Sequence, residues 1–223
     1  MLQLSYLNRI VKISLIALLF TLTIHAQIKN DPHNGEIYNP DGIALVYAEG
    51  NDTIKGFYIG KYEVTQAQWQ IIMNGNPNKF KGTDNLPVEN VSWNEVQEFL
   101  ACLNFATGKN YRLPTETEWE FAARGGLASR RYRYSGSNDF NNVAWCKNNS
   151  GRRTHPVGEK QPNELGIHDM NGNVWEWCED KEGSNRVYRG GGWFYSASSC
   201  LSRYYANPNS RSGNLGFRVV LSL

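Results

Sequence analysis

Two short segments near the start of the chain have the hydrophobic pattern of strands. Residues 42–49 (GIALVYAE) and 57–64 (FYIGKYEV) are rich in β-branched and aromatic residues and flank the turn-like GNDTIKG. Apolar runs bounded by Gly, Asn and Asp are typical of strands joined by a turn. Near the end of the chain, residues 173–177 (NVWEW) and 214–223 (NLGFRVVLSL) have a similar composition. The pattern therefore predicts strands in both parts of the chain.

Between these strands, three segments carry the signature of a helix start. In a capping box, a Ser or Thr caps the first turn and a Gln or Glu three residues later caps it in return. The three pairs are Thr65 with Gln68, Ser92 with Glu95, and Thr115 with Glu118. Helices are therefore predicted to begin at these three positions.

The second of these helices has a clear apolar stripe. Its apolar residues recur at helical spacing, and Gly108 fits the end of the helix. Cys102 lies in the same segment and is predicted to be a small core residue. The stripe consists of Trp93, Val96, Phe99, Leu100 and Leu103. The third helix is predicted to end at the Gly125-Gly126 pair.

Residues 127–170 are rich in loop formers and contain only short apolar pieces. The chain has no internal repeat and no low-complexity tract. Early helices followed by irregular loops and short strands predict a single compact α+β domain that is rich in loops.

The N-terminus has the pattern of a secretory signal. Arg9 and Lys12 precede an apolar run at residues 13–24, which is followed by Ala26 and Gln27. That run is shorter than the roughly 20 residues that a membrane helix needs. We therefore predict a signal peptide at 1–27, a polar arm at 28–40, a domain at 41–223, and no membrane span after cleavage. The protein would be exported to the periplasm, the cell surface or the medium, and an uncleaved anchor is the alternative.

Loss of the signal changes the charge of the chain. The formal net charge is +2, and residues 1–27 contain Arg9, Lys12 and no acid, so the mature chain would be neutral. A neutral chain argues against a nucleic-acid partner, because phosphate binding needs a basic surface. The high aromatic content of 13% indicates strands and turns held by aromatic packing.

The cysteines and histidines give little support to a metal or catalytic site of their own. The four cysteines (Cys102, Cys146, Cys178 and Cys200) contain no CxxC spacing. In an exported protein they could form disulfides in three alternative pairings. No HExxH or similar spacing is present either.

Six sequence blocks stand out along the chain. They are YEVTQAQW (62–69), LPVENVSWNEV (86–96), YRLPTETEWEFAARGG (111–126), NELGIHDMNGNVWEWCED (163–180), RVYRGGGW (186–193) and GFRVV (216–220). Together they resemble the formylglycine-generating, sulfatase-modifying factor family, over roughly residues 41–223. The resemblance implies a variant of the C-type lectin fold.

Family members that oxidise a sulfatase cysteine to formylglycine hold copper(I) with two cysteines, since soft thiolates select this ion. The second of those cysteines corresponds to Cys200 here, but the first corresponds to Tyr195. A phenol does not replace a thiolate as a soft ligand. We therefore interpret the copper site as degenerate and Cys200, the candidate catalytic residue at this site, as structural.

The segment DMNGNVWE (169–176) carries a separate signal for calcium. Its acids and its glycine turn offer hard oxygen ligands, which suit this ion. The resemblance implies a structural calcium site formed by Asp169, the carbonyls of Gly172 and Val174, and Glu176. The alternative is an Asx-rich turn with two solvated acids. Trp175 and Trp177, which flank Glu176, are predicted to be core aromatics.

Residues 193–214 have the composition of a binding surface. They contain Tyr, Ser and Asn in abundance, which combine rigid contact area with adaptable hydrogen bonds. The alternative is a long turn-rich loop whose aromatics pack inward. The predicted contact residues for a protein or small ligand are Trp193, Phe194, Tyr195, Arg203, Tyr204 and Tyr205.

The sequence therefore favours an exported binding or assembly module over an enzyme. One alternative is a formylglycine-generating oxidase. A second is a C-type-lectin-fold binding protein diversified by a retroelement. A third, an iron site of His155, His168 and Asp169, has no support from their spacing, and a hydrolase built on Glu116, Glu118 and Glu120 has little.

Overall fold

The computed structural model describes residues 36–38, 42–196 and 202–222. The helices are α2 (Gln66–Met73), α3 (Trp93–Thr107), α4 (Glu116–Ala123), the 3-10 turn η2 (Gly126–Ala128) and α5 (Phe140–Val143). The strands are β1 (Glu36–Tyr38), β2 (Ala44–Ala48), β3 (Phe57–Gly60), β4 (Tyr111–Arg112), β5 (Trp175–Glu182), β6 (Asn185–Arg189), β7 (Arg203–Ala206), β8 (Leu215–Gly216) and β9 (Val220–Leu221).

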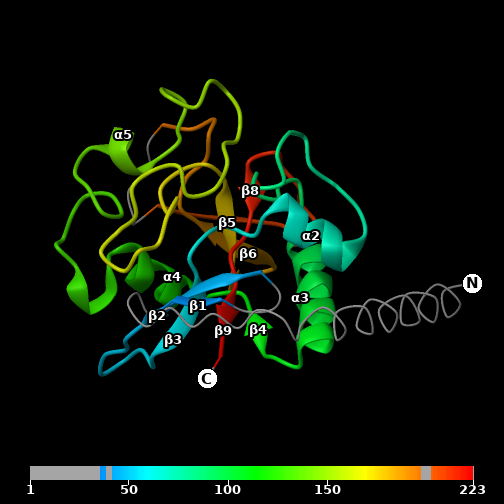
Figure 1. Ribbon diagram of the computed structural model, residues 1–223, viewed down its shortest axis with the longest axis horizontal. Coiled ribbons are helices and arrows are strands. Elements are labelled where there is room, and N and C mark those ends of the chain that lie inside the picture. Colours follow the sequence, from blue (N-terminus) through cyan, green and yellow to red (C-terminus); the bar gives the residue numbers. More distant parts are fainter. Residues whose placement is uncertain (1–35, 39–41, 197–201, 223) are drawn as a thin grey trace, which may run out of the picture.

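The strands form two sheets. The first has the order β1-β2-β3-β9-β4 and is antiparallel throughout. The second has the order β7-β6-β5-β8, in which only β5 and β8 run parallel. Because β8 and β9 follow each other closely in the chain, the C-terminal segment passes from the second sheet into the first (Figure 1).

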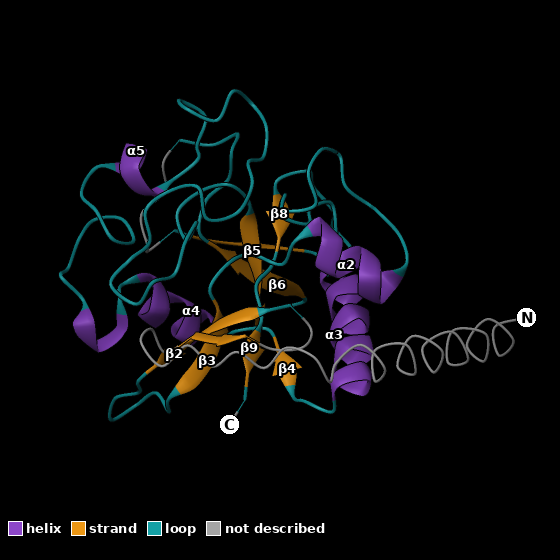
Figure 2. Cartoon of the chain, viewed as in Figure 1, coloured by secondary structure: helices purple, strands orange, loops and turns teal. Residues whose placement is uncertain are grey.

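Helices and loops cover the sheets. Figure 2 shows α2 and α3 side by side on one flank, α4 on the other, and long loops over one end. One core cluster joins α2 and α3 to Trp175, Trp177 and the C-terminal Phe217. The second joins α4, through Trp119, to the strands. This loop-rich mixture of helix and strand agrees with the predicted α+β class.

The predicted helix starts are confirmed. Each of the three capping boxes is formed, with both reciprocal hydrogen bonds present. The five residues of the predicted stripe are the buried residues of α3, and Gly108 caps it in the left-handed conformation. Cys102, on the same helix, is only half-buried, so its assignment to the core was wrong.

Several parts of the chain differ from the sequence prediction, among them β4, β6 and α5, which were not predicted. Residues 36–38, assigned to a polar arm, form β1 and pair with β2. Residues 203–206, which fall within the segment read as a surface or long loop, form β7 at the edge of the second sheet. Among the described residues, no helix is long and apolar enough to cross a membrane. The predicted signal peptide at 1–27 lies outside the described residues.

Candidate binding surface

The second sheet separates aromatic from charged side chains. Trp177 pairs with Tyr188, which pairs in turn with Tyr204, so the three share one face. The next row, Glu176, Arg189 and Arg203, occupies the opposite face. Alternation along β5, β6 and β7 therefore produces an aromatic face and an ionic face on the same three strands.

On the aromatic face, three tyrosines surround one tryptophan. Trp175 meets the rings of Tyr188, Tyr195 and Tyr204 edge to face, with centroid distances of 5.5, 5.9 and 5.2 Å. Tyr188 and Tyr204 stack with centroids 6.0 Å apart. Each such pair is worth about 0.5–1.5 kcal/mol beyond its buried area. We call Trp175 and these three tyrosines the tyrosine cluster.

The tyrosine cluster is open to solvent on its outer side. Trp175 is buried at its base, whereas Tyr195 and Tyr204 are 49% and 56% exposed. Phe194, also 49% exposed, adjoins Tyr195. Burial raises the pKa of Tyr188, and the neighbouring Tyr195 and Tyr204 raise it further. The three phenols therefore lie close to one another at the surface.

Ion pairs fix the opposite face against α4. Arg203 binds Glu116 through Nε at 2.7 Å and Glu182 through Nη2 at 2.8 Å. The adjacent Arg189 pairs with Glu120. Arg203, a predicted contact residue, is thus engaged within the chain, and Tyr205 emerges beside it with 54% exposure.

Trp193 does not belong to the exposed surface. It is 7% exposed, packs edge to face on Phe80 at 5.1 Å, and donates from Nε1 to the carbonyl of Gly213 at 2.8 Å. The prediction that Trp193 is a contact residue was therefore wrong. Its side chain instead anchors the turn that presents Phe194 and Tyr195.

The segment after β7 is held firmly to α3. Asn94 donates from its backbone to Pro208 and from its side chain to Asn209 at 2.7 Å. Asn90 donates to the carbonyl of Ser212 at 2.9 Å. These bonds make β7 and the following loop a fixed support for the tyrosine cluster. The predicted surface is therefore part helix-anchored scaffold and part exposed aromatic contact area.

A buried ionic cluster lies behind this sheet. Both carboxylate oxygens of Glu176 accept from Arg218 at 2.6 Å, and Oε2 also accepts from Trp119 at 2.6 Å. Arg218 is fully buried and also donates to the carbonyls of Gly60 and His168. It therefore links the two sheets at the point where the C-terminal segment crosses between them.

Two further buried carboxylates face the same arginine. Glu63 accepts from Asn173 at 2.7 Å and from the N–H of Val174 at 3.0 Å. Asp169 has one oxygen bonded to the N–H of Gly158 and the other without a partner. Burial raises the pKa of Glu63 well above its ordinary value and that of Asp169 to about 6.

These contacts bear on the predicted calcium ligands. Asp169, Gly172, Val174 and Glu176 do lie together in one buried segment. However, Glu176 has a protein cation on both oxygens, so calcium at this ligand set would have to displace Arg218 from it. Asp169 retains one free oxygen. Calcium binding at these residues stays a prediction.

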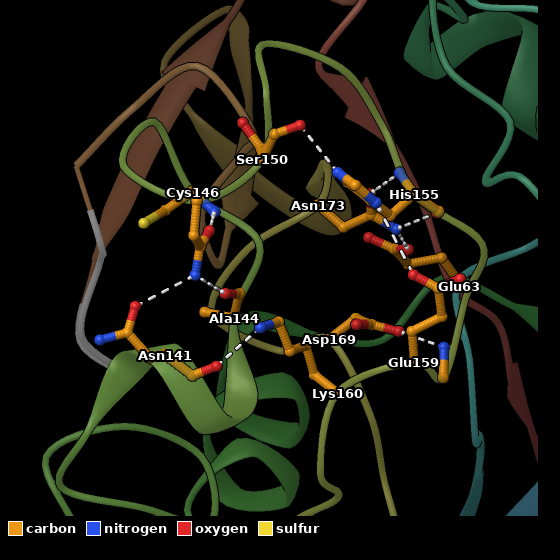
Figure 3. A network of polar contacts seen from close by, with 12 residues as sticks. Glu63, Asn141, Ala144, Cys146, Ser150, His155, Glu159, Lys160, Asp169 and Asn173 are labelled. Carbon is orange, nitrogen blue, oxygen red and sulfur yellow. Dashed lines mark hydrogen bonds and ion pairs between the residues drawn. The ribbon is translucent and has the colours of Figure 1, made fainter.

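His155 and His168 each bond the carbonyl of a neighbouring loop residue. Figure 3 shows His155 bonded through Nε2 to the carbonyl of Ser150 and linked through Asn173 to Glu63. His168 bonds the carbonyl of Lys160 through Nδ1. Within the described residues, no group of three His, Cys, Asp or Glu side chains could hold a metal ion.

The remaining candidates have structural partners or lie outside the described residues. Glu116, Glu118 and Glu120 are each paired with arginine, which explains them without catalysis. Cys102, Cys146 and Cys178 form no disulfide with one another. Cys200, the predicted structural or catalytic cysteine, falls within 197–201 and is not described.

The model of the family "Sulfatase-modifying factor enzyme 1-like domain" matches residues 29–223. The chain belongs to this family. The match extends across the strand at 36–38, so the domain includes part of the predicted arm.

Three similar proteins show how varied the family is. "Chaperone protein LppX" of Paenibacillus barcinonensis is 36% identical over 79% of this chain and 84% of its own length. A formylglycine-generating enzyme of Streptomyces coelicolor is 36% identical over 62% of this chain. The match spans about half (54%) of the length of that enzyme. The structure of "Treponema denticola variable protein 1" has a TM-score of 0.69 and 29% identity, and covers 80% of this chain and 91% of its own. The last match supports the predicted C-type-lectin-like fold.

Proposed function

We propose that this protein is a binding or assembly module that holds other polypeptides at the tyrosine cluster and Phe194. The observation that carries the proposal is the exposure of Phe194, Tyr195 and Tyr204 on a support fixed by hydrogen bonds and ion pairs. Rigid exposed aromatics are the residues that most often dominate binding energy. The name of the Paenibacillus relative, a chaperone, supports a protein partner.

The module would act outside the cytoplasm. The proposal of export rests on the signal-like sequence at 1–27. The diversified binding protein, an alternative named above, would use the same surface with a different partner in each variant. Calcium at Asp169, Gly172, Val174 and Glu176 would be structural in either case.

A holdase assay tests the proposed function. We expect the protein to suppress the light scattering of reduced insulin, and Tyr195→Ala/Tyr204→Ala to require about tenfold more protein for the same effect. Loss of two aromatic anchors commonly removes at least this much affinity. Both positions are about half exposed, so the double variant should fold, which its circular dichroism and melting temperature would check.

Tyr205→Ala is the matched control. Tyr205 is as exposed as Tyr204 and adjoins it in β7, but it belongs to the ionic face. It should leave suppression unchanged. Equal suppression by the wild type and the folded double variant would refute the assignment to the tyrosine cluster.

The second candidate function is that of a formylglycine-generating oxidase, favoured by the similarity to enzymes of that name. It requires copper(I) bound by thiolates, and Tyr195 stands at one ligand position. We therefore expect titration of the reduced protein with copper(I) to show no tight stoichiometric site. The controls are Cys200→Ser and Cys146→Ser, because Lys147, next to Cys146, donates to the carbonyl of Tyr195. Stoichiometric binding lost in either control would favour the oxidase.

A further inference from the structure

The three tyrosine hydroxyls of the tyrosine cluster are a polar feature of its surface. None of the hydroxyls of Tyr188, Tyr195 and Tyr204 has a hydrogen-bond partner among the described residues. A phenol hydroxyl is a strong donor that usually finds a partner where it is partly buried. The cluster therefore presents three neighbouring hydroxyls, on an aromatic base, to whatever binds there.

The cluster is also electrically neutral. None of its four members is an acidic or basic residue of the Asp, Glu, Lys, Arg or His type. The nearby arginines are directed to the other face, where Arg189 and Arg203 pair with glutamates. A charged ligand would lose hydration here without gaining a counter-charge. The ligand that fits is therefore uncharged at the point of contact.

The cluster is shallow as well, since Tyr195 and Tyr204 are each about half exposed. A shallow site gives little area with which to offset the ordering of a flexible ligand. It favours a segment that is already stiff in its free state. A polyproline II helix meets this condition, because it is extended and preformed in solution.

We infer that the tyrosine cluster recognises a proline-rich segment in the polyproline II conformation. This inference rests on the proposed function and names the kind of polypeptide held. Pyrrolidine rings would pack on the exposed ring surfaces of Tyr195 and Tyr204. Backbone carbonyls would accept from the hydroxyls, and proline adds no N–H that needs an acceptor. Aromatic-lined surfaces are a general way to bind such segments.

The test uses a fluorescein-labelled peptide of about ten prolines, a length that forms a stable polyproline II helix. We expect saturable binding by fluorescence anisotropy, with a Gly/Ser peptide of equal length unbound. Tyr195→Phe/Tyr204→Phe keeps the rings and removes two hydroxyls. It should weaken binding about tenfold, in line with lost hydrogen bonds at a desolvated contact. Tyr205→Phe, on the opposite face, should bind as the wild type does.

The outcomes separate this inference from the proposed function. If the protein suppresses insulin aggregation through Tyr195 and Tyr204 but ignores the proline peptide, the proposed function stands and the polyproline inference is wrong. Equal binding by the wild type and the Phe double variant would show that the hydroxyls have no role, and would also overturn it. Binding of fluorescein-labelled maltohexaose that is weakened in Tyr195→Phe/Tyr204→Phe, with no binding of the proline peptide, would overturn the inference in favour of a glycan. Absence of both activities would count against the proposed function itself.

Discussion

Replacing Arg218 by methionine is expected to destabilise the protein by about 3–5 kcal/mol, the usual effect of removing one partner of a buried ion pair. Arg218 is fully buried and supplies two bonds to Glu176 and one each to the carbonyls of Gly60 and His168. Without it, Glu176 keeps only the Trp119 indole as donor, while Glu63 and Asp169 lose the cation that faces them. Native domains have only about 5–15 kcal/mol of stability in total.

Urea unfolding would measure the effect, and two variants make it specific. Glu176→Gln added to Arg218→Met removes the orphaned charge, so the double variant should be more stable than the single one. Arg203→Met removes an arginine from two partly exposed ion pairs and should change stability by less than about 1 kcal/mol. A loss below about 1 kcal/mol in Arg218→Met would contradict the central role of this arginine.

Two isolated charged residues in the sequence point to this ionic cluster, although the cluster was not predicted. Arg218 is the single charged residue in the apolar run GFRVV. Glu63 lies shortly after the apolar strand segment FYIG. A single charge within a buried strand almost always has a buried partner. The identity of that partner depends on how β5, β8 and β9 are arranged in the two sheets, and no local sequence pattern determines this arrangement.

Helices were predicted well because their determinants are local. The capping boxes and the stripe of α3 involve residues three to seven positions apart, and each formed as expected. The strand β7 was missed for the opposite reason. Its sequence, Arg-Tyr-Tyr-Ala, shows no clear alternation of polar and apolar residues. The two faces of β7 are set by its pairing with β6, in which Tyr188 lies opposite Tyr204 and Arg189 lies opposite Arg203.

The exposure of the predicted contact residues was anticipated in part. Composition indicated that Phe194, Tyr195, Tyr204 and Tyr205 lie at the surface, and all four are exposed. It misplaced Trp193, because the residues that bury it, Phe80 and Gly213, are remote in the chain. Composition also could not reveal Trp175 and Tyr188 as members of the tyrosine cluster, since a binding surface of this kind is assembled by sheet register.

Glu89 is expected to make the protein more stable at mildly acidic than at mildly basic pH. It is fully buried, with one oxygen bonded to the N–H of Phe80 at 2.7 Å and the other without a partner. Burial raises its pKa from 4.5 to about 7, a rise that the N–H groups of Phe80 and Lys79 and the Lys79 charge only partly offset. The ionised form is thus disfavoured in the folded state.

The sign follows from linkage between protonation and folding. For a carboxyl whose pKa is raised on folding, the stabilising contribution is complete below the unfolded value and is lost as pH rises through the folded value. Between about pH 6 and pH 8 the contribution of Glu89 should therefore fall. Asp169, with a pKa of about 6, acts in the same direction at somewhat lower pH. The contribution of Glu118 to stability has the opposite pH dependence, because its pKa is lowered on folding. That contribution is lost only as the pH falls below about 4.5.

Glu89→Gln isolates this contribution. The amide keeps an oxygen for the Phe80 N–H and cannot ionise, so the variant should gain about 1–2 kcal/mol at pH 8 and lose part of the pH dependence. Urea unfolding at about pH 6 and pH 8 measures both effects. Glu49→Gln, at an exposed position, should change neither. If Glu89→Gln were less stable than the wild type at pH 8, the unpartnered oxygen would have to be held by a cation or an ordered water, because only such a partner would make the ionised form favourable there.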